Sequence, residues 1–88
     1  MDYPIIDAFS NSVRLQLLCC LANGPKNVQE LIGTCGLSQS AVSQHLQKLR
    51  LAGLVRDEKN GKFVYYSLTY PKVATIAKQL QDFVKEVK

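Results

Sequence analysis

The sequence offers little from which an enzyme active site could be built. Among its 88 residues there is a single histidine, His45. Two serines, Ser40 and Ser43, stand close to it, but a nucleophile and its base also need a third group that orients the base. This stretch supplies no such group, so we expect no catalytic activity.

A membrane-spanning segment and a secretion signal are also missing. No run of residues is both long enough and poor enough in charge to span a membrane. The N-terminal "MDYPIIDAFS" lacks the basic start and the apolar run of a signal peptide. We therefore expect a cytoplasmic protein without membrane contact. Its net charge of +4 suits a polyanionic partner.

The sequence has few cysteines: Cys19, Cys20 and Cys35. Their number is odd, and adjacent cysteines rarely bond to each other. Disulfides are also uncommon in cytoplasmic proteins, so we expect no disulfide framework. The three side chains are then either small packed hydrophobic groups or redox-active thiols, and both interpretations stay open.

The first half of the chain is rich in helix signals instead. Ser10-Asn11 can cap a helix that ends at the "NGP" of residues 23–25. The segment "NVQE" has the spacing of a capping box and predicts a helix over residues 28–34, which Gly36 can end. A short helical turn is also expected near Pro4 to Phe9.

The next helix has the most distinctive polar face. Ser38 can cap it, it runs to about Ala52, and Gly53 ends it. A stripe at helical spacing would be buried: Val42, Leu46 and Leu49. The opposite face would carry small, amide and basic side chains: Gln39, Ser40, Ser43, Gln44, Gln47 and Lys48.

The periodicity changes after residue 53. "LVRDEKNGKFVYYSL" contains two extended runs around Asn60-Gly61, which is a strong hairpin signal. Thr69 can cap a last helix, with Pro71 tolerated in its first turn. The sequence thus predicts a mainly α fold with a small β-hairpin, in the order helix, helix, helix, hairpin, helix.

Two helices joined at Cys35-Gly36, with a hairpin after the second, describe a winged helix-turn-helix. The segments "VRLQLLCCL", "VQELIGTCGLSQSAVSQHLQKLRLAGLV" and "GKFVYYSL" together resemble the ArsR/SmtB family of bacterial transcriptional repressors. The resemblance covers roughly Ser12 to Leu68. It implies that residues 1–88 form a single DNA-binding domain, which represses transcription as a homodimer on a palindromic operator.

The resemblance also implies that residues 70–88 form the dimerisation helix. The apolar stripe of this helix is wider than the core of so small a domain is expected to cover. A second copy of the chain would bury the rest of it. Part of the stripe can instead pack on its own domain. The interface residues that we expect are Ile76, Leu80, Phe83, Val84 and Val87.

The helix over 39–52 corresponds to the family's recognition helix. Glutamine can pair with an adenine edge, and serine can contact a base or a phosphate. Ser38, at the cap, suits a phosphate. His45 is expected to be a DNA-backbone or groove contact, or a packing residue. The DNA-binding residues expected on this helix are Ser38, Gln39, Ser40, Ser43, Gln44, His45, Lys48 and Arg50.

The hairpin tip "KNGK" places Lys59 and Lys62 across a tight turn. By resemblance, such a wing tip reaches the adjacent minor groove or its phosphates. The alternative is that the two lysines are solvated residues beside an exposed hairpin edge. Arg56 is a weaker candidate for a DNA contact. Leu51 stands where family members usually carry a charged residue, and it either packs against the hairpin or is exposed.

Family members often release DNA when they bind a metal, but this chain lacks the ligands. Cys35 corresponds to one thiol of the usual pair, whereas Gly33 stands at the other position. The last helix has no histidine, so we expect no metal site and no cofactor. Thiol-switch members carry one cysteine at the position of Cys19 and a second in the last helix, which is missing here. The inducer therefore stays unknown, with Cys19, Cys20 and Cys35 as possible redox residues.

One alternative function stays open. A winged helix can also serve as a protein-interaction module without specific DNA binding, and the modest charge of this chain permits it. Binding to double-stranded DNA at low salt distinguishes the two functions.

Overall fold

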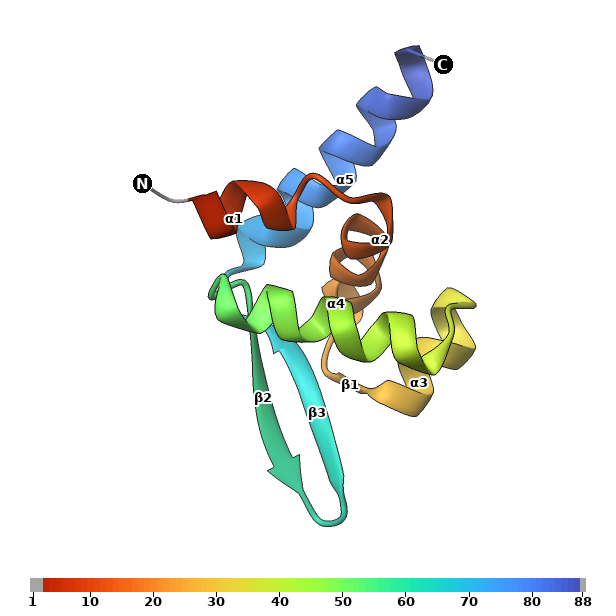
Figure 1. Ribbon diagram of the computed structural model, residues 1–88, viewed down its shortest axis with the longest axis vertical. Coiled ribbons are helices and arrows are strands. Elements are labelled where there is room, and N and C mark those ends of the chain that lie inside the picture. The colour runs from red at the N-terminus through yellow and green to blue at the C-terminus, as the bar shows by residue number, and fades with distance from the viewer. Residues whose placement is uncertain (1–2, 88) are drawn as a thin grey trace.

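The computed structural model describes residues 3–87. The helices form one body, and a hairpin extends from it (Figure 1). The elements in chain order are α1 (Tyr3–Ala8), α2 (Ser12–Cys20), a 3₁₀ turn η1 (Leu21–Asn23), β1 (Lys26–Asn27), α3 (Val28–Cys35), α4 (Gln39–Leu51), β2 (Val55–Asn60), β3 (Phe63–Leu68) and α5 (Pro71–Val87). The predicted order is confirmed, including the helical turn before residue 9.

The predicted caps of α2 and α3 form as expected. The Asn11 side chain accepts hydrogen bonds from the amides of Val13 and Arg14 at the start of α2. Asn27 and Glu30 form a complete capping box on α3. Each cap satisfies amides that the first turn of a helix leaves without a partner, and replacing one costs about 1 kcal/mol.

The turn between α3 and α4 depends on Gly36, which has a φ of 68°. Residues with a side chain rarely adopt this left-handed conformation. Ser38 then accepts a hydrogen bond from the amide of Ala41 and begins α4. The two helices of the helix-turn-helix are therefore set by a glycine and a cap only two residues apart.

The core lies where α2, α3 and α4 meet. Its largest fully buried side chains are Leu17, Leu18, Leu31, Val42, Leu46 and Leu49. The predicted buried stripe of α4 is confirmed. Each of these side chains contributes about 1.5–3 kcal/mol through its removal from water, so this packing fixes the orientation of α4.

The hairpin is part of a three-stranded antiparallel sheet with the order β1-β3-β2. The short strand β1 pairs Lys26 with Tyr66, and no sequence signal predicted it. Asn60 pairs with Phe63, so the turn residues are Gly61 and Lys62 rather than Asn60-Gly61. Gly61 has a φ of 66°, and a glycine at the first turn position is typical of a type II′ turn.

The start of α5 differs from the prediction. Thr69 does not cap it, because Tyr70 rather than Thr69 directly precedes the helix; the Thr69 hydroxyl instead donates to the carbonyl of Gly53 at 2.6 Å. The helix begins at Pro71 instead. Val73 and Ala77 are buried against the body, whereas the last two turns of α5 project beyond it (Figure 1).

The expectation of no disulfide is wrong for one pair. Cys20, at the end of α2, is bonded to Cys35, at the end of α3, and their Cα atoms lie 6.8 Å apart. The packing of α3 on α2 brings together two residues separated by 15 positions, which spacing along the chain did not reveal. Within residues 3–87, no helix is long and apolar enough to cross a membrane.

Candidate nucleic-acid interface

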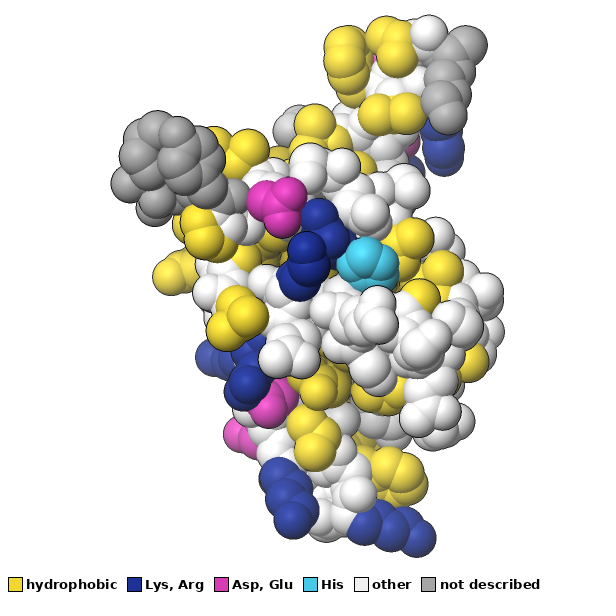
Figure 2. All heavy atoms as spheres, in the orientation of Figure 1, with side chains coloured by type: hydrophobic (Ala, Val, Ile, Leu, Met, Phe, Trp, Pro, Cys, Tyr) yellow, Lys and Arg dark blue, Asp and Glu magenta, His cyan; other side chains and the backbone are white. Residues whose placement is uncertain are grey.

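The outer face of α4 is polar and exposed, as predicted. Figure 2 shows mostly uncharged polar side chains on the face that carries this helix. The exposed residues there are Gln39, Ser40, Ser43, Gln44, Gln47 and Lys48. Glutamine amides and serine hydroxyls can donate and accept hydrogen bonds, so this face can match the edges of base pairs.

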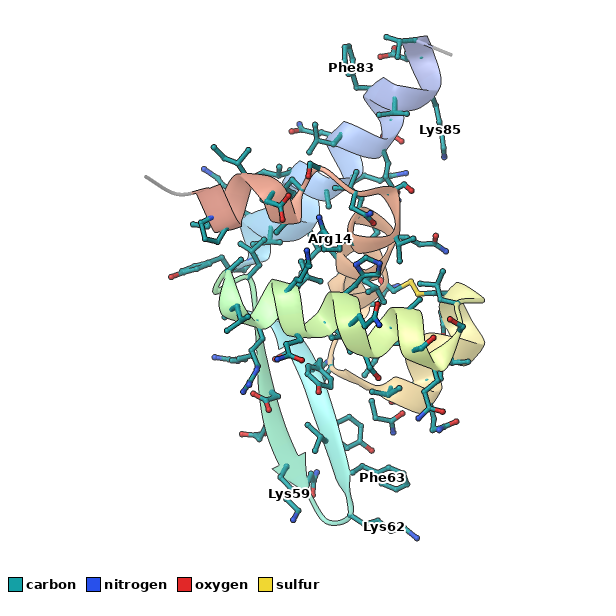
Figure 3. The ribbon with its side chains drawn as sticks, in the orientation of Figure 1. Arg14, Lys59, Lys62, Phe63, Phe83 and Lys85 are labelled. Carbon is teal, nitrogen blue, oxygen red and sulfur yellow. A yellow bond between two sulfur atoms is a disulfide. The ribbon has the colours of Figure 1, made fainter. Side chains whose placement is uncertain are left out.

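The wing tip carries the two predicted lysines. Lys59 and Lys62 are exposed and point into solvent from the end of the hairpin (Figure 3). The ammonium of Lys62 lies 5.8 Å from the centre of the Phe63 ring, and this ring packs edge-on against Tyr65 at 6.4 Å. The aromatic pair therefore supports the tip, while both ammonium groups stay available to an anion.

Two arginines near the wing have partners within the chain. Arg50, at the end of α4, forms an ion pair of 3.6 Å with Asp57 on β2. Arg56 donates through Nε to the hydroxyl of Ser67 at 3.3 Å. Exposed ion pairs are worth little, so Arg50 can leave Asp57 at small cost. In this structure, however, its contact joins α4 to the wing.

His45 lies on the flank of α4 and contacts Arg14, which was not among the predicted site residues. Nη1 of Arg14, on α2, lies 3.2 Å from Nδ1 of His45. Arg14 is only 5% exposed, and Figure 3 shows it between α1, α2 and α4. One feature of the sequence could have indicated that Arg14 is buried: it stands four residues before Leu18, on the apolar stripe of its helix.

Arg14 also holds the end of α1. Its Nε donates to the carbonyl of Ala8 at 3.2 Å, and its Nη2 donates to the carbonyl of Asp7 at 2.8 Å. The Asp7 carboxylate lies 3.7 Å from the same Nη2. One buried guanidinium thus joins the end of α1 to the flank of α4.

The surroundings of His45 favour its neutral form. Burial lowers the pKa of His45, and the positive charges of Arg14 and Lys48 lower it further. At neutral pH the ring is therefore uncharged, as its hydrogen bond from Arg14 requires.

The cysteines divide into one bonded pair and one thiol. Cys19 is half-buried and donates to Oε1 of Gln81, on α5, at 3.3 Å. Burial raises the pKa of the Cys19 thiol, and the carboxylate of Asp82 adds to this, against the opposing effect of Lys78 and Lys85. Cys19 is thus a poor nucleophile. In the described part of the chain, no three His, Cys, Asp or Glu side chains are grouped to hold a metal.

Both α5 and α1 expose apolar side chains. On α5, Phe83 is 59% and Val87 67% exposed, and Ile76 and Val84 are also exposed. Leu80 differs, because it packs partly against the core of its own domain. Ile5 and Ile6 on α1 are exposed as well. Leu51 is 74% exposed and lines an open groove of about 690 Å³ beside α1, so it does not pack on the hairpin.

Comparison with known proteins decides the family. The model of the bacterial regulatory protein arsR family matches residues 11–57, which include α2, α3 and α4. The chain belongs to the ArsR family. The family prediction is confirmed, and with it the interpretation as a DNA-binding transcriptional regulator.

Two relatives show how far the similarity extends. The transcriptional activator HlyU of Vibrio cholerae is 41% identical over 76 residues, which is 86% of this chain and 70% of HlyU. The biofilm growth-associated repressor of Xylella fastidiosa is 37% identical over 86% of this chain and 67% of its own length.

Solved structures of ArsR-family members have the same fold. HlyU from Vibrio cholerae superposes with a TM-score of 0.77 at 39% identity, covering 91% of this chain and 87% of HlyU. The repressor BigR from Xylella fastidiosa gives 0.80 at 35% identity over 91% and 82%. A homodimeric winged helix-turn-helix DNA-binding domain from Mycobacterium bovis gives 0.78 at 30% over 94% and 77%. The winged helix-turn-helix prediction is therefore confirmed.

Proposed function

We propose that this chain is a homodimeric repressor that binds a palindromic operator, with α4 in the major groove and the wing on adjacent phosphates. The observation that carries the proposal is the outer face of α4, where amide and hydroxyl side chains stand exposed on a helix fixed by its buried stripe. Gln39, Ser40, Ser43 and Gln44 occupy its first half, the part from which such helices read bases.

The backbone contacts in this proposal come from four basic side chains and one cap. Ser38 lies at the N-terminus of α4, where helix ends favour anions. Lys48 and Arg50 lie toward the other end, and Lys59 and Lys62 lie at the wing tip. Phosphate contacts of this kind supply affinity and register without sequence information.

The proposed dimer uses the exposed apolar surface of α5. Phe83, Val84 and Val87 lie on the part of the helix that extends beyond the body, and Ile76 lies nearer to it (Figure 3 labels Phe83). Leu80 would contribute less, because its own domain already covers part of it. The homodimeric relative from Mycobacterium bovis supports a two-fold arrangement, which places two α4 helices on two half-sites.

Selection of duplexes from a random pool tests this function. We expect the wild-type protein to enrich an imperfect palindrome with half-sites one helical turn apart. Placing that duplex upstream of a reporter should lower transcription when the protein is present. A folded protein that enriches no sequence, and binds no duplex at low salt, would favour the protein-interaction alternative. Increased transcription would show an activator.

The dimer has its own test. Phe83→Glu places a charge within the proposed interface, so sedimentation should show a monomer, and affinity for the palindrome should fall at least tenfold. Lys85→Gln, on the same end of α5, is a matched control, because it changes the net charge by the same amount and leaves the apolar surface intact. A Phe83→Glu variant that stays dimeric would place the interface elsewhere.

We propose that DNA binding is regulated by oxidation and reduction of one pair of thiols, Cys20 and Cys35. This pair joins α2 to the end of α3, next to the turn that positions α4. A peroxide or small disulfide would oxidise the two thiols by removing two electrons and two protons. DNA affinity should differ between oxidised and reduced wild-type protein, and equally so in Cys19→Ser. A redox effect that persists in Cys20→Ser would exclude this pair.

A further inference from the structure

The contact between Arg14 and His45 determines which nitrogen of the ring carries the proton. A guanidinium has five N–H donors and no acceptor, and it keeps its charge in proteins. Nη1 of Arg14 lies 3.2 Å from Nδ1 of His45, so Nδ1 must accept and cannot carry a proton. The proton of the neutral ring is then on Nε2.

This arrangement leaves His45 with a free donor on the flank of α4. The residue is half-buried, and in Figure 2 the histidine reaches the surface next to Lys or Arg side chains. Lys48 lies three residues further along α4 and therefore on the same side of the helix. A neutral N–H donor and an ammonium on one flank of a DNA-reading helix match a phosphate oxygen.

Arg14 is itself held in place, which makes it suited to a positioning role. Its other nitrogens are bound to the carbonyls of Asp7 and Ala8 and lie near the Asp7 carboxylate. A buried group with several partners keeps one geometry. The orientation of the His45 ring is therefore fixed before any DNA arrives.

We propose that Arg14 positions His45 as a neutral donor, through Nε2–H, to a phosphate of the DNA backbone beside α4. Arg14 does not touch DNA in this arrangement and acts only through the ring of His45. The inference rests on the proposed function, because it assumes that α4 lies in the major groove.

The tautomer can be measured in the free wild-type protein. Long-range proton–nitrogen NMR spectra at pH 7.5 distinguish the two neutral tautomers of histidine. We expect His45 as the Nε2–H form, with a shift of the Nε2–H proton when the selected duplex is added. A predominant Nδ1–H form, or an even mixture, would contradict the role of Arg14.

Variants test the contact with DNA. His45→Ala and Arg14→Gln should each lower affinity about tenfold, equally on the selected duplex and on a scrambled duplex, because a phosphate contact carries no sequence information. The double variant should lose little more than either single variant, since both remove the same contact. Lys78→Gln, on α5, matches the charge change of Arg14→Gln and should bind like wild type.

The outcomes separate the inference from the proposed function. A folded Arg14→Gln protein should show His45 as a mixture of tautomers, which a purely structural role of Arg14 would not produce. If His45→Ala binds both duplexes like Lys78→Gln, the inference fails while the proposed function stands. If wild type binds neither duplex, the proposed function fails and the phosphate contact with it. Where Arg14→Gln does not fold, His45→Ala and the wild-type spectrum decide.

Discussion

The two regions with candidate DNA contacts, α4 and the wing tip, are held in place very differently. Val42, Leu46 and Leu49 fix α4 from below, and Arg14 fixes its flank. The wing tip extends away from the body, and Lys59 and Lys62 are exposed there (Figure 3). A rigidly packed helix can hold several hydrogen-bonding groups in one pattern, which base recognition needs. A lysine on an exposed hairpin supplies charge without a precise geometry.

The largest expected difference between the two regions is in stability. Leu46→Ala should lower the free energy of unfolding by about 2–5 kcal/mol, because it leaves a cavity in the core. Val64→Ala, on the exposed part of the wing, should cost less than about 1 kcal/mol. Urea unfolding at one protein concentration measures both. Equal losses would show that the wing is as tightly packed as α4.

The second difference concerns sequence discrimination. Gln44→Ala should weaken binding to the selected duplex by about 1–3 kcal/mol and leave binding to a scrambled duplex unchanged, as expected for a lost base contact. Gln79→Ala, an exposed glutamine on α5, is the matched control. Fluorescence anisotropy with both duplexes gives the two affinities. An equal loss on both would remove Gln44 from the base-reading residues.

The third difference concerns salt dependence. Lys59→Ala combined with Lys62→Ala should weaken binding to both duplexes, and the slope of log affinity against log salt should decrease by about one to two. Lys72→Ala combined with Lys78→Ala removes the same charge from α5 and controls for net charge. With an unchanged slope in the wing variant, the lysines would be solvated residues without a phosphate contact.

The smallest expected effect is a pH dependence of stability that arises from His45 on α4 and has no counterpart in the wing. Because the pKa of His45 is lowered in the folded state, unfolded chains bind the proton more readily. The stability from neutral His45 is therefore fully present above the unfolded pKa of about 6.5 and is lost as pH falls below it. Thermal unfolding from pH 7.5 to 5.5 should show a steeper loss for wild type than for His45→Ala. Identical profiles would contradict the neutral pair with Arg14.

Local signals explain why most of the fold was predictable. Asn27, Gly36 and Ser38 begin or end helices through contacts with their immediate neighbours. Their spacing in the sequence is therefore enough to predict where those helices begin and end. The same holds for the outer face of α4, whose exposed side chains follow helical periodicity. The turn of the hairpin was misplaced by one residue, because "NG" suits a type I′ turn and the strands pair in another register.

The parts that were not predicted depend on contacts distant in the sequence. Arg14 and His45 are 31 residues apart, and Cys20 and Cys35 meet only because α3 packs on α2. The strand β1 has two residues and takes its conformation from pairing with β3. Thr69 is a residue type that often caps helices, but α5 begins one residue too late for it, and its hydroxyl donates to the carbonyl of Gly53, 16 residues away in the sequence.

The most direct test of the account compares wild-type affinity for the selected duplex and for its scrambled version over a range of salt concentrations. Affinity for both should fall as salt rises, because the proposed contacts of lysines with phosphates form in either case. The selected duplex should bind more tightly throughout, because the proposed contacts of α4 with bases form only there. Two coincident lines would contradict the claim that α4 reads sequence.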